Sequence, residues 1–138
     1  MNRKRFSCIF LVVAIVACTA YAQQNAPTVA TMPPVVVKTV PQSGDTEVDP
    51  RLTEIRVTFS KDMTDGSWSW STMSQGTFPE IVGKPKYLDD KRTCVLTVKL
   101  EAGKTYGTWL NSGKFGNFKD ASKNSAVPYL LIFETKAE

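Results

Sequence analysis

The stretch that decides the fold is LTEIRVTFSKDM, residues 52–63. Within it, Ile55, Val57 and Phe59 alternate with charged or hydroxyl-bearing neighbours. This period of two is typical of a β-strand with one buried face. The strand ends in a polar Ser-Lys-Asp, and Met63 is placed to fold back over its apolar end. We therefore predict a strand that organises the core and that a turn closes.

The rest of the chain predicts further short strands laid against this one. Their expected ranges are 35–40, 67–71, 77–82, 85–88, 93–100, 105–111 and 129–135. Turn signals separate them about every ten residues, and no segment has the 3.6-residue period of an amphipathic helix. The pieces within 77–88 are weak and carry two prolines, so we expect them at a sheet edge. The pattern indicates an all-β, antiparallel β-sandwich of about seven strands.

An N-terminal leader precedes the domain. Arg3-Lys4-Arg5 is basic, Ile9 to Val16 is apolar, and Ala20-Tyr21-Ala22 has the form of a cleavage site. These features predict a secretory signal peptide over residues 1–22, whose apolar run is too short to span a bilayer. We therefore expect a secreted or periplasmic protein.

A lipoprotein signal is the alternative at the same place. Ile15-Val16-Ala17-Cys18 resembles a lipobox, in which Cys18 would be lipidated and would anchor the protein in the cell envelope. The A-x-A site is the better match. We expect membrane association only if Cys18 is lipidated.

Residues 23–33 are polar and aperiodic, and they predict a flexible tether before a domain over residues 34–136.

Charge and residue counts exclude several function classes. The chain has 17 basic and 13 acidic residues, and removing the leader leaves 14 against 13, with no basic run that could follow a phosphate backbone. We therefore expect no nucleic-acid partner. The chain has no histidine, which excludes Ser-His-Asp and Cys-His catalysis and His-ligated zinc.

Cys94 is the one cysteine outside the leader. No disulfide can therefore form within the exported chain. Its strand pattern places Cys94 on the side of Leu96 and Val98, so we expect an inert, buried thiol.

Several motifs, in this order, resemble the bacterial Ig-like domains of the SbsA surface-layer type. They are Pro34–Val36 with Pro41 and Gly44, Val48–Pro50, Ile55–Met63, Leu100–Tyr106, Asp120 with Asn124, and Phe133–Thr135. One departure is Asp120-Ala121-Ser122-Lys123-Asn124, where family members often have Gly before the Asn. The resemblance implies a seven-stranded Ig-like sandwich, one module of larger exported proteins that space, anchor or bind. It implies no shared active site and no cofactor.

The carboxylates favour structural roles. Asp89 and Asp90 lie in a turn, as do Asp62 and Asp65, and turn aspartates commonly bond their own backbone. Calcium binding through Asp62, Asp65 or Asp120 would need more oxygen ligands at fixed spacing than the sequence offers. We expect neither catalysis nor a metal site.

The tryptophans are the candidate binding residues. Trp68 and Trp70 are two apart on one expected strand, so both point into the core or both point out. The inward alternative fits the buried tryptophan of many Ig-like sandwiches. In the outward alternative they form a platform with Trp109, Leu130 and Ile132, because the third, sixth and seventh strands of this topology are neighbours. Trp109 is expected outside, since Tyr106 and Leu110 take the other face.

The sequence predicts an exported, non-catalytic module for protein interaction or adhesion at the cell envelope. The alternative is a carbohydrate-binding module that uses the tryptophan face. The partner is then a protein or a glycan at the cell surface.

Overall fold

The computed structural model describes residues 26–137. The predicted signal peptide, its cleavage site after Ala22 and Cys18 lie outside these residues and stay predictions. Residues 26–32 form a unit of their own, in which the N–H groups of Thr31 and Met32 both bond the carbonyl of Thr28 in a turn. None of the described residues forms a helix of the length and apolarity that crossing a membrane requires.

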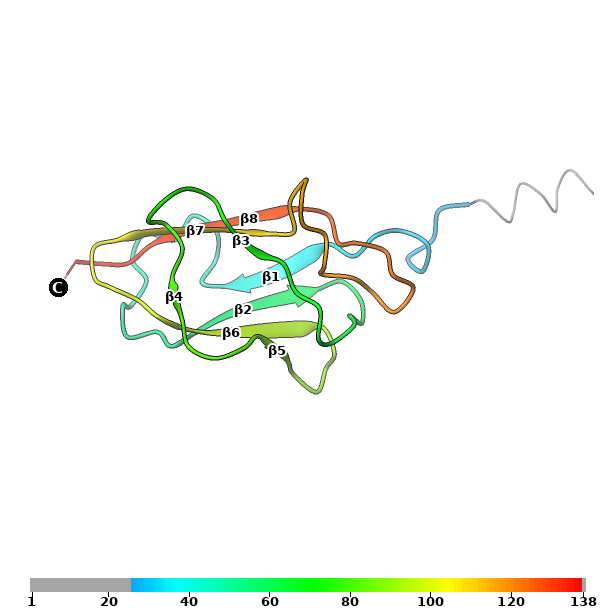
Figure 1. The fold of residues 1–138 in the computed structure, drawn as a ribbon, viewed down its shortest axis with the longest axis horizontal. Coiled ribbons are helices and arrows are strands. Elements are labelled where there is room, and N and C mark those ends of the chain that lie inside the picture. The colour runs from blue at the N-terminus through cyan, green and yellow to red at the C-terminus, as the bar shows by residue number, and fades with distance from the viewer. Residues whose placement is uncertain (1–25, 138) are drawn as a thin grey trace, which may run out of the picture. The chain divides into compact units, whose positions relative to one another are not determined.

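Two antiparallel sheets face one another in the domain that begins at Pro33 (Figure 1). The strands are β1 (Val36–Val40), β2 (Glu54–Phe59), β3 (Trp70–Thr72), β4 (Glu80–Ile81), β5 (Lys86–Tyr87), β6 (Thr93–Lys99), β7 (Thr105–Leu110) and β8 (Tyr129–Glu134). The larger sheet has the order β1-β2-β6-β4, with β5 also paired to β6, and the smaller has the order β3-β7-β8. The predicted all-β sandwich is confirmed. The weak stretch 77–88 contributes two short strands, as its two expected ranges predicted, and the domain has eight strands where about seven were expected.

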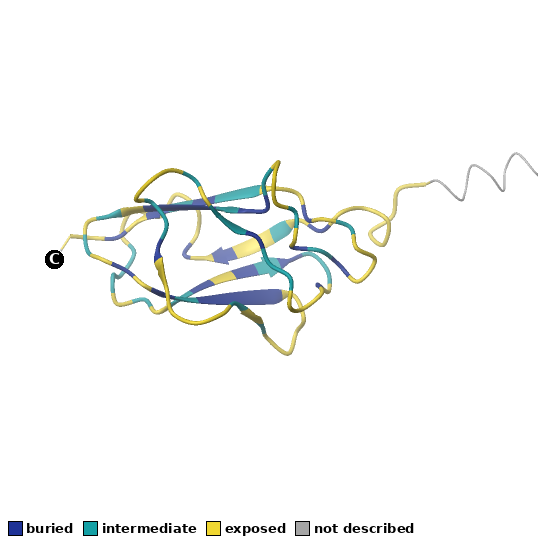
Figure 2. Cartoon of the chain, viewed as in Figure 1, coloured by how far each residue is buried: buried dark blue, intermediate teal, exposed yellow. Residues whose placement is uncertain are grey.

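The organising strand, β2, lies between β1 and β6. Ile55 and Val57 are opposite Leu96 and Cys94 of β6, and all four side chains are fully buried. Figure 2 shows that the buried residues run along β2, β6 and β7, the strands that enclose the core. The apolar residues that alternate in this stretch are therefore the ones that β2 packs against the other sheet.

Aromatic side chains fill the end of the core where β2 stops. The rings of Phe59 and Phe118 are 5.1 Å apart between centroids, and Trp70 meets Phe118 edge-on at 5.7 Å. Met63 is only 7% exposed and packs in the same cluster. The predicted role of Met63 as a cap on this end is confirmed.

One pair of family motifs meets at the β6–β7 corner. The hydroxyl of Tyr106 accepts a hydrogen bond from the N–H of Glu101 at 2.8 Å, which is a variant of the tyrosine corner of Ig-like sandwiches. The hydroxyl of Thr135 donates to the carbonyl of Glu101 and accepts from the N–H of Lys104. Gly103 has a φ of 64°, a conformation that glycine adopts without steric cost. The separated motifs therefore belong to one hydrogen-bonded corner.

A second pair of motifs meets where β2 ends. Lys61 Nζ lies 3.0 Å from Asp120 Oδ2, and Met63 forms an antiparallel bridge with Asp120. The backbone N–H of Asn124 donates to the same carboxylate at 2.8 Å. Lys123, in the place of the family's glycine, has a φ of 67°. The loop thus keeps a left-handed residue at this position although its glycine is missing.

Candidate functional site

The outer face of the smaller sheet carries a row of apolar side chains. Directly paired residues of an antiparallel ladder project to the same face. Trp109 pairs with Ser71 on one side and with Leu130 on the other, and Ile132 lies two residues further along β8. Trp109, Leu130 and Ile132 are each half-buried and together form what we call the outer-face patch.

Met73 extends this patch. Gly107 pairs with Ile132 and so belongs to the outer face. A Cβ atom on Gly107 would lie 2.7 Å from Cε of Met73, so the absence of a side chain at Gly107 lets the methionine lie flat on β7. Met is an adaptable contact residue because its unbranched thioether side chain takes many shapes.

Trp68 and Trp70 do not belong to the outer-face patch. Trp70 pairs with Leu110, whose side chain is buried, and both tryptophans pack against the core cluster around Phe118. Their Nε1 atoms are buried and make no hydrogen bond within residues 26–137. The inward alternative is thus the one the structure shows. The platform of five residues is wrong, because the ladder register divides it between the two faces of the sheet.

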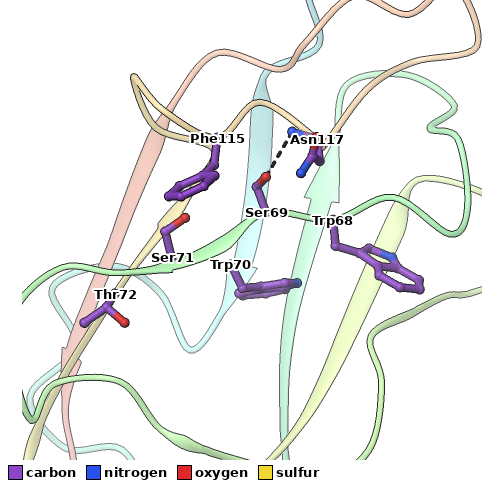
Figure 3. A pocket seen from close by; sticks show the side chains of 7 residues that line it. All are labelled: Trp68, Ser69, Trp70, Ser71, Thr72, Phe115 and Asn117. Atoms are coloured by element: carbon purple, nitrogen blue, oxygen red, sulfur yellow. Dashed lines mark hydrogen bonds between the residues drawn. The ribbon is translucent and has the colours of Figure 1, made fainter.

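A shallow pocket of about 440 Å³ opens beside β3 (Figure 3). Its lining residues are Trp68, Ser69, Trp70, Ser71, Thr72, Phe115 and Asn117. Phe115 is 53% exposed, and Asn117 is held in place because its N–H donates to Ser69 Oγ at 3.0 Å. Figure 3 shows Trp68 and Trp70 on one side of β3 and Ser71 and Phe115 on the other. None of these seven lining residues is charged.

Cys94 has the properties of a core residue. It is fully buried, and burial raises the pKa of its thiol to about 12. Burial likewise raises the pKa of the neighbouring Tyr87. A thiol that stays protonated is a poor nucleophile and a poor metal ligand. The predicted burial of Cys94 is confirmed, and its inertness stays a prediction.

Three of the aspartates weighed as catalytic or calcium-binding residues have structural partners. Asp62 forms an ion pair with Arg92, and Asp120 with Lys61. Hydrogen bonds from Thr93 lower the pKa of Asp90. In residues 26–137 no three Cys, Asp or Glu side chains gather as metal ligands.

Asn111 is a structural residue that the sequence pattern did not reveal. It is 1% exposed and has a φ of 58°. Its side-chain amide donates to the carbonyls of Phe118 and Ala126 and accepts from the N–H of Phe118. These bonds fix the long loop after β7, and with it Phe115 and Asn117 at the pocket. A single Asn at a strand end gives no periodic signal that would have identified it.

Comparisons with known proteins agree with this architecture. Residues 30–135 match the family described as the bacterial Ig-like domain. Two solved structures of an S-layer protein, SbsC (31–844) and its domains 1–6, are each 19% identical with a TM-score of 0.50. Each covers 97% of this chain, which spans only 17% of either structure's own length. No curated protein matches the sequence. At this identity the two structures establish the fold alone.

Proposed function

The chain belongs to the bacterial Ig-like domain family, and from that premise we propose that it is an exported, non-catalytic module that binds a protein at the cell envelope. The observation that carries the proposal is the outer-face patch. Trp109, Leu130 and Ile132 lie together on a sheet face that no other strand of residues 26–137 covers.

The residue chemistry supports a binding role over catalysis. The chain lacks histidine, its buried thiol has a raised pKa, and its candidate aspartates are engaged in ion pairs or turns. Proton transfer and nucleophilic attack need a group with a tuned pKa in a cleft. An apolar, tryptophan-containing patch is instead typical of the centre of a protein interface.

The envelope location rests on the predicted signal peptide and on the family. It is consistent with a structural likeness to proteins named as S-layer proteins. In this proposal, residues 23–33 stay the predicted tether before the domain, and the sandwich presents the outer-face patch to the partner.

The test is a binding assay with a single substitution. The chain is immobilised and exposed to solubilised envelope proteins of its own host, in parallel with Trp109→Ala and with Val127→Ala. Val127 is 47% exposed but lies outside the patch, so it is a matched control for removing surface apolar area. Specific capture that Trp109→Ala loses and Val127→Ala keeps supports the proposal. Equal capture by all three forms contradicts it.

A glycan is the second candidate partner. Trp109 offers a flat indole, and its neighbour Ser71 adds a hydroxyl on the same face, a combination that suits a sugar ring. Binding to a glycan array that Trp109→Ala abolishes, without capture of any envelope protein, would favour this candidate over the first.

A further inference from the structure

The free edge of β3 has a row of unpaired backbone groups. The N–H of Asn111 bonds the carbonyl of Ser69, and Ser71 pairs with Trp109, so the backbone groups of these two serines face β7. In an antiparallel ladder the alternate residues face the opposite way. Trp68, Trp70 and Thr72 therefore direct their N–H and C=O groups away from β7. Strand β3 ends its sheet, and no hydrogen bond within residues 26–137 reaches these groups.

The other sheet edges of the domain are protected. The outer side of β8 is covered by residues 43–45, where Gly44 N–H bonds the carbonyl of Ile132 and Glu134 N–H bonds that of Asp45. Strand β1 contains a bulge and Lys38. Strands β4 and β5 have two residues each, Lys84 and Pro85 lie between them, and Lys86 begins β5. Covering, bulges, lysine, proline and short length are the devices that prevent strand pairing at edges.

The edge at β3 has fewer of these devices. Residues 68–72 read Trp-Ser-Trp-Ser-Thr, without charge or proline, and the β3–β7 register shows no shift. The regular strand is short, but Trp68 and Ser69 continue the same alternation, since Asn111 bonds Ser69 in register. An incoming strand would therefore find donors and acceptors at three alternate residues.

The pocket beside this edge fits a side chain of an incoming strand. It is lined by residues 68–72 themselves, with Phe115 and Asn117 as its remaining wall. Because three of the seven lining residues are aromatic and none is charged, an aliphatic or aromatic side chain would enter the pocket more favourably than a charged one. The edge also continues into the outer-face patch through Ser71, the ladder partner of Trp109.

We propose that the free edge of β3 binds an extended, uncharged segment of a partner protein by strand addition, with an apolar side chain in the Phe115 pocket. The inference rests on the proposed function, because it names the form in which the protein partner binds. Backbone hydrogen bonds supply affinity in this mode, and the pocket selects the side chain. The outer-face patch then contacts neighbouring parts of the same partner.

The test uses short synthetic peptides of alternating Thr and a variable residue, with Val, Phe, Lys or Glu in turn at the variable position. Binding to the chain is measured by fluorescence anisotropy of labelled peptides. The Val and Phe peptides are expected to bind, and the Lys and Glu peptides to bind at least about tenfold more weakly. N-methylation is then moved along the best peptide one residue at a time. Strand addition predicts loss of binding at every second position only.

Two variants of the chain locate the site. Thr72→Pro removes an N–H that faces away from β7, whereas Thr72→Val keeps it and is the matched control. Phe115→Ala removes one wall of the pocket, with Val127→Ala as its control. Thr72→Pro and Phe115→Ala should each weaken the best peptide at least about tenfold, while both controls bind like the parent chain. If Thr72→Pro does not fold, the N-methylated peptides and Phe115→Ala still test whether the partner binds by strand addition at this edge.

Three outcomes would overturn the inference. They are absence of peptide binding, binding that is insensitive to N-methylation, and self-association of the chain that Thr72→Pro abolishes, because the edge would then pair with a second copy. Capture of envelope proteins can also separate the two proposals. If Trp109→Ala loses capture but Thr72→Pro keeps it, the proposed function is supported and only the strand-addition inference is overturned. If the chain binds neither the peptides nor any envelope protein, both the strand-addition inference and the proposed function are overturned.

Discussion

Trp70 and Trp109 belong to neighbouring strands of one sheet, yet their side chains lie on opposite faces. Trp70 is the ladder partner of Leu110, and Trp109 is the partner of Ser71. Trp70 meets Phe118 in the core, whereas Trp109 lies beside Leu130 on the outer face. The same residue type therefore has a structural role at one position and, in our proposal, a binding role at the other.

The two tryptophans should differ in their effect on stability. Trp70→Ala removes a ring that packs on Phe118 and should lower the free energy of unfolding by about 3 kcal/mol, as large-to-small core changes do. Trp109→Ala should cost about 1 kcal/mol, which is usual away from the core. Urea denaturation followed by circular dichroism measures both. A similar loss in the two variants would show that Trp109 is also a core residue.

The ion pair between Lys61 and Asp120 should contribute to stability because both side chains are shielded from water. They are 16% and 4% exposed. Lys61→Met leaves Asp120 without its cation and should cost about 2 to 3 kcal/mol, since breaking a buried pair leaves a charge uncompensated. Arg92→Met breaks the exposed pair with Asp62 and should cost less than about 1 kcal/mol. An equal cost for the two variants would contradict the burial argument.

The same aspartate should make the domain sensitive to acid. Burial alone would raise the pKa of Asp120, but hydrogen bonds from Asn124 and Lys61 outweigh it and the pKa is lowered. The unfolded chain, with an Asp pKa of about 3.9, then takes up the proton first as the pH falls. This contribution to stability is complete above that value and disappears as the pH falls through the folded-state pKa. Asp120→Asn should flatten this part of the stability–pH curve, and an unchanged slope would argue against it.

Lys123 should be replaceable by glycine with a gain in stability. Its φ of 67° is unfavourable for a residue with a Cβ atom, and family members often have Gly there. We expect Lys123→Gly to stabilise the domain by about 0.5 to 1 kcal/mol. Ser122→Gly, one residue earlier and without a positive φ, should give no gain and provides the control. A loss in Lys123→Gly would mean that the lysine side chain compensates for the strain.

Burial of the Cys94 thiol should make the domain less stable at alkaline pH. Burial raises the folded-state pKa to about 12, against about 8.5 in an unfolded chain. The contribution is therefore complete below about pH 8.5 and is lost as the pH rises toward 12. Cys94→Ala should reduce the slope in this window. Iodoacetamide should leave the native thiol unmodified at pH 8 and label it in denaturant, and rapid labelling of the native chain would refute the buried placement.

The sequence was sufficient for much of the fold. The alternation in Ile55, Val57 and Phe59 identified the organising strand because one face of a sheet must be apolar to pack. The family motifs are separated in sequence, yet they meet in two places. Glu101 forms hydrogen bonds with both Tyr106 and Thr135, and Lys61 forms an ion pair with Asp120. Their order therefore reflects two hydrogen-bonded corners that the fold requires.

The candidate site was less predictable. Period two required Trp68 and Trp70 to share a face but could not say which, because that depends on their register with β7 and on Phe118 from a distant loop. Phe115 and Asn117 lie at the pocket because Asn111 bonds the loop that carries them, and a single Asn has no periodic pattern that could predict this. The unpaired edge of β3 likewise depends on which segments end each sheet, which only the assembled topology shows.

The central claim is that the outer-face patch binds a partner while the inward tryptophans hold the fold. The most direct measurement is capture of envelope proteins by Trp109→Ala and by the parent chain, with the unfolding free energy of each measured in parallel. We predict that Trp109→Ala remains folded and loses specific capture, whereas Val127→Ala retains it. Retention of full capture by a folded Trp109→Ala chain would contradict the account.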